Sequence, residues 1–420
     1  MKSAGERDRR ARHGHFALVL VALAACAGPR TETPLAVREL PSPAGPGSGE
    51  PNLAVAPDGR VLLSWIEPAG EGRHALRYAG LDGEAWSAPR AIAEGSGWFV
   101  NWADFPALAA LPDGTLFAHW LAKTGPSTYA YAVQVARSQD GGKTWSSAVV
   151  PHRDGTPTEH GFVSMTPWSD QSMGILWLDG RKTTGAAHAA HGEAGAEMAL
   201  VHTTLDSDGR LGAETVLDGR VCDCCQTDAA RAGDAVVVVY RDRSEKEVRD
   251  MSVVRFADGH WSPPRTLAAD GWEINGCPVN GPAVAADGAK VAAAWFTAAG
   301  DKPRVKVAFS ADSGAVFGSP ILVDDGRPLG RVDVVLLDGG AALVSWLEQG
   351  EKGAATLRVR RVASDGSRGA AATVAESTGA RSSGFPRMAR SGAKVILAWR
   401  DASDPPTVRT GVLDLAPSDE

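Results

Sequence analysis

A short apolar run that ends in an aromatic residue recurs seven times along the chain, and this repeat limits the folds open to it. The spacings between successive aromatic residues are 55, 57, 63, 55, 51 and 53 residues. The seven residues are Trp65, Trp120, Trp177, Tyr240, Trp295, Trp346 and Trp399. A period of this length is typical of propellers and other arrays, in which each repeat is one supersecondary unit.

Each repeat has the pattern of four strands joined by tight turns. A small-residue run such as "PNLAVAPDG" precedes the aromatic run, and a longer alternating run such as "RVKVAFSADSG" follows it. Asp-Gly turns between β-rich runs are typical of hairpins. Helical periodicity is nearly absent, which speaks against a helical solenoid. The sequence therefore predicts an all-β fold, a β-propeller built from four-stranded blades.

The number of repeats predicts seven blades, with six as the alternative. The last repeat has only three strands before the sequence ends. The run "PLAVREL" at 34–40 could supply the fourth strand from the other end of the chain, which would leave no open sheet edge. The predicted propeller domain is 34–415, with 34–40 as the closing strand, 41–50 as a linker and 416–420 as a tail.

The N-terminus has the pattern of an exported lipoprotein, with 1–25 as the signal peptide and 26–33 as a tether. A basic leader precedes an apolar run that suits a secretory h-region and is too short to span a bilayer. The run ends in Leu-Ala-Ala-Cys, which resembles a bacterial lipobox; the resemblance implies lipidation of Cys26. Ala27 follows, and the sorting rule for such lipoproteins then indicates the outer membrane, on its periplasmic or its outer side. An ordinary signal peptide is the alternative.

One turn resembles a known motif. Residues 138–145, "SQDGGKTW", resemble the Asp box S-x-D-x-G-x-T-W of the sialidase-like (BNR repeat) propellers, and 310–317 is a degenerate second copy. The matching residues are Ser138, Asp140, Gly142, Thr144 and Trp145. Their implied role is structural, because Asp and Ser satisfy backbone N–H groups in a tight turn, Gly supplies positive φ and Trp packs the hairpin on its blade.

The resemblance implies a propeller that binds or processes glycans, with exo-sialidase-like glycoside hydrolysis as the implied reaction. Catalytic sialidases have six blades and open with a Phe/Tyr-Arg-Ile-Pro element, whereas this sequence has "GFPRMA" at 384–389. They also need a Tyr nucleophile paired with Glu, and an Asp acid/base. The sequence therefore leaves open whether the chain is an enzyme.

In a propeller, the loops that lead into the first strands and those that leave the second strands lie on one face, called here the loop face. Candidate catalytic residues in these loops are Asp104, Glu159, Asp242 and Tyr240, although Tyr240 also occupies the structural aromatic position. Guanidinium groups could bind an acidic ligand bidentately. The candidates are Arg181, Arg241, Arg243, Arg331, Arg387 and Arg400. Arg–Asp pairs that only satisfy one another are the alternative.

Four of the five cysteines fall in two neighbouring loops of the same face, namely Cys222, Cys224 and Cys225 before the fourth blade and Cys277 before the fifth. Three interpretations fit them. They form disulfides that join the loops, as an oxidising compartment favours; they bind Cu or Zn through thiolates, with His160 as a further ligand; or they form a redox pair.

Two other functions fit the sequence besides glycan processing: a non-catalytic propeller with a Cys-rich metal or redox site, and an assembly scaffold. The net charge of −7 gives no reason to expect nucleic acid as a partner, because such binding uses basic surfaces. We expect a monomer, attached to the membrane through the lipid on Cys26, whose ligand is a glycan or a small acidic molecule.

Overall fold

The computed structural model describes residue 1 and residues 35–183, 197–401 and 403–415. Cys26 and the predicted signal peptide lie outside these residues. Contacts divide the chain into Met1–Thr33 and Pro34–Glu420, and the second unit is described below. Within the described ranges, no helix combines the length and the apolar character that a membrane span requires.

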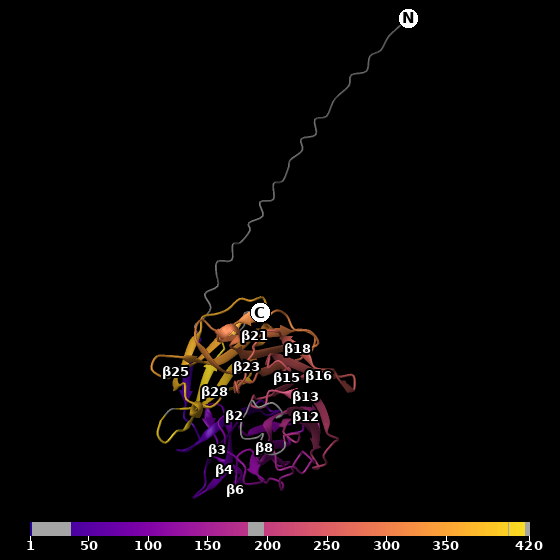
Figure 1. The fold of residues 1–420 in the computed structure, drawn as a ribbon. Coiled ribbons are helices and arrows are strands. Elements are labelled where there is room, and N and C mark those ends of the chain that lie inside the picture. The colour runs from indigo at the N-terminus through magenta and orange to yellow at the C-terminus, as the bar shows by residue number, and fades with distance from the viewer. Residues whose placement is uncertain (2–34, 184–196, 402, 416–420) are drawn as a thin grey trace. The chain divides into compact units, whose positions relative to one another are not determined.

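Seven antiparallel blades, each built on a four-stranded plan, form a ring, and the chain runs once round it from indigo to yellow in Figure 1. Blades 1 to 3 comprise β2 (Gly49–Val55), β3 (Val61–Pro68), β4 (Arg73–Asp82), β5 (Ala85–Trp86) and β6 (Arg90–Ser96); β7 (Ala107–Ala110), β8 (Leu116–Lys123) and β9 (Tyr131–Ser138); and β10 (His160–Ser169), β11 (Ser172–Asp179), β12 (Met198–Asp206) and β13 (Thr215–Val221).

Blades 4 to 6 continue the ring. They comprise β14 (Asp228–Ala232), β15 (Ala235–Arg241), β16 (Met251–Ala257), β17 (His260–Trp261) and β18 (Arg265–Ala268); β19 (Ala283–Asp287), β20 (Lys290–Thr297), β21 (Arg304–Ser310) and β22 (Ile321–Leu322); and β23 (Pro328–Leu336), β24 (Ala342–Gln349), β25 (Ala354–Val362) and β26 (Ala372–Thr378). In blades 1 and 4 the fourth strand is split into two pieces that both pair with the third strand. In blade 2 it is reduced to Val149, which exchanges two backbone hydrogen bonds with Val135.

The last blade is closed by a strand from the other end of the chain. It contains β27 (Arg387–Ser391), β28 (Lys394–Arg400) and β29 (Val408–Asp414), and β1 (Val37–Leu40) pairs antiparallel with β29. Figure 1 shows the yellow β28 beside the indigo β2, where the ring closes. The predicted seven blades and closing strand are therefore confirmed, and the six-blade alternative is wrong.

The repeated aromatic residue lies in the second strand of each blade and is buried between blades. Five of the seven are among the largest fully buried side chains, namely Tyr240 and the four tryptophans Trp65, Trp177, Trp295 and Trp346. Each indole N–H donates to a carboxylate, for instance from Trp177 to Asp179 Oδ2 at 2.7 Å. A buried indole needs such a partner, since an unpaired N–H is costly.

Polar side chains at the start of the first strands join consecutive blades. The Asp104 carboxylate in blade 2 accepts from the N–H of Phe162 in blade 3 at 2.7 Å. Asp228 accepts in the same way from Val284, and Asp333 from Met388. These three hydrogen bonds hold buried acidic side chains near the axis of the ring, where the first strands of the blades converge.

The turn at 138–145 is held by its own side chains. Asp140 accepts from the backbone N–H groups of Lys143 and Thr144 at 3.0 and 2.9 Å and from the Thr144 hydroxyl at 2.6 Å. Gly142 has φ +79° and its N–H donates to Ser138 Oγ. Trp145 packs edge-on against Tyr78 of the preceding blade. The turn therefore ties blade 2 to blade 1 and lies away from the loop face.

Candidate functional site

A cavity of about 280 Å³ lies on the axis of the ring. Every blade contributes to its lining, through residues that include Asn52, Ala107, Phe162, Thr227, Gly281, Val332 and Arg387. Asp104 and Asp228 also line it. The cavity therefore combines carboxyl groups and a guanidinium with apolar walls, which is the usual composition of a small-ligand site.

Aromatic rings and arginines from distant blades meet beside the cavity. Phe385 packs on Trp102 and on Phe105, with ring centroids 5.8 and 5.6 Å apart. The Arg331 guanidinium lies 4.8 Å from the Trp102 ring centroid, and that of Arg387 lies 5.6 Å from Phe105. The cluster presents flat apolar faces next to positive charge, as sugar rings with acidic substituents require.

Arg387 is short of protein partners. Its Nε lies 3.6 Å from Asp333 Oδ2, which is too long for a hydrogen bond, and this buried atom has no hydrogen-bond partner in the described part of the chain. Asp333 is buried, and burial raises the pKa of its carboxyl although Arg387 opposes the shift. The Arg387 guanidinium thus retains donors that can bind a ligand in the cavity.

The other five predicted arginines make hydrogen bonds or ion pairs within the protein. Their partners are Asp179 and Glu214 for Arg181, the carbonyls of Arg249, Asn280 and Phe296 for Arg241, Glu247 for Arg243, the carbonyls of Ala380 and Gly384 for Arg331, and the carbonyl of Ser382 for Arg400. The structure therefore does not assemble the six into one clasp, because each of these five side chains is held by a backbone carbonyl or a carboxylate near it.

Two predicted carboxylates meet at a tyrosine that the sequence analysis missed. The Tyr131 hydroxyl lies 2.6 Å from Glu159 Oε1 and 3.0 Å from Asp104 Oδ2. Its ring is stacked on Phe99 at 4.0 Å, and the side chain is buried. One hydroxyl proton can serve only one of the two carboxylates, so the arrangement favours a second, shared proton on the pair.

Asp104 is the member of this cluster that faces the cavity. Burial raises the pKa of its carboxyl to about 7, although hydrogen bonds from Phe162 and Tyr131 oppose the shift. A carboxyl that titrates near neutral pH is suited to general acid–base chemistry. The signal in the sequence was weak: Tyr131 begins a third strand at the loop face, where Asp104 and Glu159 were already expected.

Tyr240 and Asp242 do not join this cluster. The Tyr240 hydroxyl donates to Asp218 Oδ2 at 2.7 Å, and its ring is buried in the core. Asp242 accepts from the backbone N–H of Arg243, and burial raises the pKa of its carboxyl. The structure therefore places neither residue with Asp104 and Glu159, and Tyr240 occupies the repeated aromatic position in the core.

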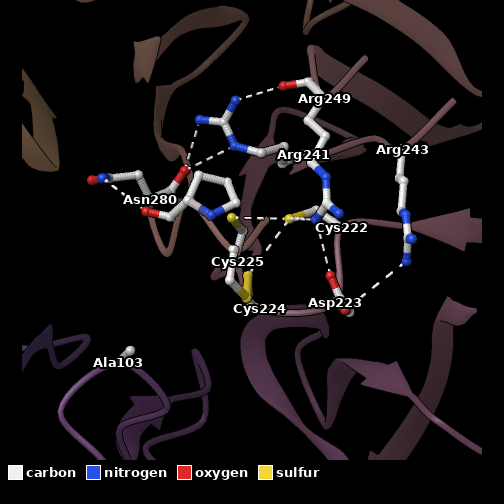
Figure 2. The surroundings of a disulfide bond; sticks show 12 residues. Ala103, Cys222, Asp223, Cys224, Cys225, Arg241, Arg243, Arg249 and Asn280 are labelled. Carbon is white, nitrogen blue, oxygen red and sulfur yellow. Dashed lines mark hydrogen bonds and ion pairs between the residues drawn. A yellow bond between two sulfur atoms is a disulfide. The ribbon is translucent and has the colours of Figure 1, made fainter. Parts of the chain in front are cut away.

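The four predicted cysteines lie together, as Figure 2 shows for three of them. A disulfide joins Cys224 to Cys277 and so ties the loop before blade 4 to the loop before blade 5. Cys222 and Cys225 are free, buried thiols whose sulfurs lie 3.2 Å apart, and Cys222 Sγ lies 3.9 Å from Cys224 Sγ.

A buried arginine, Arg249, lies beside the free thiols and favours the ionised form of Cys222. Arg249 Nη1 lies 3.3 Å from Cys222 Sγ and 3.0 Å from Asp223 Oδ1, and its side chain has no exposure (Figure 2). Burial alone would raise the pKa of Cys222, but the hydrogen bond from Cys225 and the charge of Arg249 outweigh it and bring the pKa to about 7. Burial and the neighbouring Cys222 raise the pKa of Cys225. Near neutral pH, Cys222 is therefore the cysteine of the pair that ionises, while Cys225 keeps its proton.

The structure places His160 beside His152 and Asp154 and not beside the cysteines. Its ring stacks on His152 with centroids 3.7 Å apart, and its Nε2 faces Asp154 Oδ1 at 3.1 Å. The reason is local: His160 is the first residue of β10, and the loop that precedes this strand folds back over it.

Comparisons with known proteins agree on the fold. No family model matches the chain, and no curated protein matches it. A protein of unknown function from Dyadobacter fermentans is 15% identical over 91% of this chain and 98% of its own, with a TM-score of 0.51. An α-L-arabinanase from Penicillium chrysogenum, solved with arabinobiose, is 14% identical over 90% and 98%, also at 0.51. A leech intramolecular trans-sialidase is 10% identical over 84% and 82%, at 0.47. At these identities, the likeness at 0.51 shows the fold alone.

Proposed function

We propose that this protein is a glycan-processing propeller of the cell envelope that binds an acidic sugar in the axial cavity and hydrolyses its glycosidic bond as an exo-glycosidase with two catalytic carboxyl groups. The observation that carries the proposal is Arg387, a cavity-lining guanidinium with unused donors. Two carboxyl groups that titrate near neutral pH, Asp104 and Asp228, line the same cavity. Lipidation of Cys26 would hold the propeller at the outer membrane.

The groups around the cavity have separable roles. Arg387 binds the ligand's carboxylate, because guanidinium pairs with carboxylate through parallel hydrogen bonds. Phe105 and Phe385 pack on the apolar face of the sugar ring. Asp104 donates a proton to the leaving oxygen as the glycosidic bond breaks. Asp228, whose pKa burial raises to about 6 against the opposing charge of Arg387, accepts a proton from the water that attacks the anomeric carbon.

Replacing Arg387 by alanine is expected to lower kcat/KM on a fluorogenic sialoside by about 10- to 100-fold, since a hydrogen bond to a charged group contributes about 1.5–3 kcal/mol. Turnover is measured on the purified full chain with the sialoside and with a neutral arabinoside. The loss should be confined to the acidic substrate, because the missing group is the one that binds the carboxylate.

Arg390→Ala is the matched control. Arg390 belongs to the same strand, β27, but its guanidinium binds the Leu336 carbonyl and Asp338 and does not line the cavity. Its kinetics should match those of the unmodified protein. No turnover of either substrate above background would remove the proposed hydrolysis, and equal effects of the two variants would remove Arg387 from the site.

A second candidate function, thiol–disulfide exchange, is favoured by the position of Cys222 beside the disulfide. The Cys222 thiolate would attack the Cys224 sulfur, forming a Cys222–Cys224 bond and breaking the Cys224–Cys277 bond. Cys277 then leaves as a thiolate, so the step is redox-neutral and needs no further reactant. Arg249 stabilises the attacking thiolate through its contact at 3.3 Å.

The ultraviolet absorbance of thiolate, followed against pH, tests this candidate. The native protein should show one buried thiol that ionises near pH 7, and Arg249→Gln should move this transition upward because it removes the stabilising charge. Cys222→Ala should abolish the transition. A transition that persists in Cys222→Ala would assign the thiolate to another cysteine and contradict the exchange.

A further inference from the structure

Cys222 and Cys225 lie at the two ends of one tight turn and have the spacing C-x-x-C. Asp223 and Cys224 form the turn between them (Figure 2). The sulfurs of Cys222 and Cys225 lie 3.2 Å apart, whereas Cys222 Sγ lies 3.9 Å from Cys224 Sγ. A disulfide bond is about 2.0 Å long, so a small movement of the side chains joins the two free thiols. Cys225 has no part in the functions proposed above.

The two thiols differ in the way that disulfide chemistry requires. Arg249 Nη1 lies 3.3 Å from Cys222 Sγ, and its positive charge favours the thiolate of Cys222. Burial and the adjacent Cys222 raise the pKa of Cys225, which therefore keeps its proton. A thiolate beside a protonated thiol supplies one sulfur that attacks a disulfide and a second sulfur that resolves the product. The pair thus has the two members of a redox-active dithiol.

The surroundings of the pair also suit its oxidised form. Both side chains are buried, and a thiolate removed from water is costly, whereas a disulfide carries no charge. Arg249 keeps its charge compensated when the thiolate disappears, because it also pairs with Asp223 Oδ1 and Glu247 Oε2, each at 3.0 Å. Oxidation therefore does not leave a buried guanidinium without a partner.

Cys277 gives the buried pair a route to the solvent. It is half-buried, whereas Cys222, Cys224 and Cys225 are buried. Its sulfur is bonded to Cys224, the residue that the Cys222 thiolate attacks in the exchange described above. That attack releases Cys277 as a thiolate. Cys277 is therefore the cysteine of the four that a dissolved molecule reaches first.

We propose that Cys222 and Cys225 are a two-electron redox couple that reduces a low-molecular-weight disulfide through Cys277. The proposal rests on the thiol–disulfide exchange of the second candidate function and is independent of the glycoside hydrolysis. It adds a net oxidation, because the exchange alone only moves one disulfide among the four cysteines. The oxidised protein has two bonds, Cys222–Cys225 and Cys224–Cys277.

Four exchange steps balance the reaction with an external disulfide, RSSR. The Cys222 thiolate attacks Cys224 and releases the Cys277 thiolate, which attacks RSSR and releases one RS⁻. Cys225 then loses its proton and attacks Cys222, which forms the Cys222–Cys225 bond and releases the Cys224 thiolate. Cys224 attacks Cys277, restores their bond and displaces the second RS⁻. The two protein thiols lose two electrons, and the two RS⁻ take up the protons that Cys222 and Cys225 gave up.

Oxidised glutathione is the probe that tests the couple. The folded full chain is equilibrated in buffers of reduced and oxidised glutathione, quenched with acid, alkylated and mapped by peptide mass spectrometry. Cys222 and Cys225 should both be alkylated in the more reducing buffers. In the more oxidising buffers, both should lose their alkylation together and carry no glutathione. Alkylation of both residues in every buffer would overturn the proposal, and this measurement needs no variant to fold.

Two matched variants test the route. Cys225→Ala lacks the sulfur that resolves the Cys222–Cys224 bond, so the reaction should stop with this bond formed and glutathione attached to Cys277. Cys222→Ala lacks the attacking sulfur and should keep the Cys224–Cys277 bond without glutathione. Glutathione on Cys222 in place of Cys277 in the first variant would overturn the route.

The outcomes separate this proposal from the exchange on which it rests. If the Cys225→Ala protein forms the Cys222–Cys224 bond while the unmodified protein never forms Cys222–Cys225, the exchange stands and the redox couple is wrong. If neither bond forms in any buffer, both are wrong.

Discussion

Replacing both Cys224 and Cys277 by alanine is expected to lower the free energy of unfolding by about 4 kcal/mol. The disulfide closes a loop of 53 residues, and the chain-entropy model assigns about this value to a loop of that length. The effect is large because the bond closes the whole segment 224–277, so without it the two ends of this segment can move apart in the unfolded chain and the conformational entropy of that state rises. Denaturant unfolding under non-reducing conditions measures it.

The matched control keeps the two loops joined. Cys222→Ala/Cys225→Ala removes the same number of sulfurs and leaves the Cys224–Cys277 bond, so its midpoint should lie well above that of the first variant. Reduction of the unmodified protein should lower its midpoint toward that of Cys224→Ala/Cys277→Ala. Equal midpoints for the oxidised and the reduced protein would show that the disulfide contributes nothing to stability.

Asp104→Asn is expected to make the protein more stable above pH 7 and to remove its proposed hydrolytic activity. The carboxyl has a pKa of about 7 in the folded protein against an ordinary 3.8, so folding favours its protonated form. Stability is therefore lost as the pH rises from about 4 to 7, by about 4 kcal/mol in total. Asparagine resembles the protonated acid, since it can accept from the Phe162 N–H and donate to Tyr131, but it cannot supply a catalytic proton.

Unfolding measured at pH 5 and pH 8 tests this prediction. The unmodified protein should lose stability between the two values, and Asp104→Asn should lose much less. Asp140→Asn is a control in which the substitution should destabilise the protein. Hydrogen bonds from Thr144 and Ser138 hold the pKa of Asp140 below its ordinary value, so folding favours its ionised form, which asparagine cannot replace. Asp140→Asn should be less stable than the unmodified protein at both pH values. A pH dependence unchanged in Asp104→Asn would show that Asp104 ionises freely.

The fold could be predicted from the sequence because its signal is repeated. The aromatic residue of the second strand recurs seven times, and each copy fills the same space between blades. The run at 34–40 could be assigned to the last blade because a sheet edge left open is unfavourable. The fourth strand in blades 1 and 4 is divided at 87–89 (Ser-Ala-Pro) and at 262–264 (Ser-Pro-Pro), where proline has no N–H to donate to the ladder. This signal was not used in the sequence analysis.

The site could be predicted only in part, because partners at the axis come from loops far apart in sequence. Arg241 and Arg387 look alike in the sequence, yet three backbone carbonyls hold the first and the second faces the cavity. Tyr131 went unnoticed for the same reason: it gains its significance from two carboxylates that only the folded loops bring near.

Ring closure by β1 has a consequence for the order of folding. The register from Val37 with Leu413 to Leu40 with Thr410 joins segments that are synthesised at opposite ends of a long chain. Such distant contacts form slowly and late. While the C-terminal segment is still being made, the first blades have no neighbour on one flank and the seventh blade lacks its outer strand. The ring can therefore close only after β29 has been synthesised.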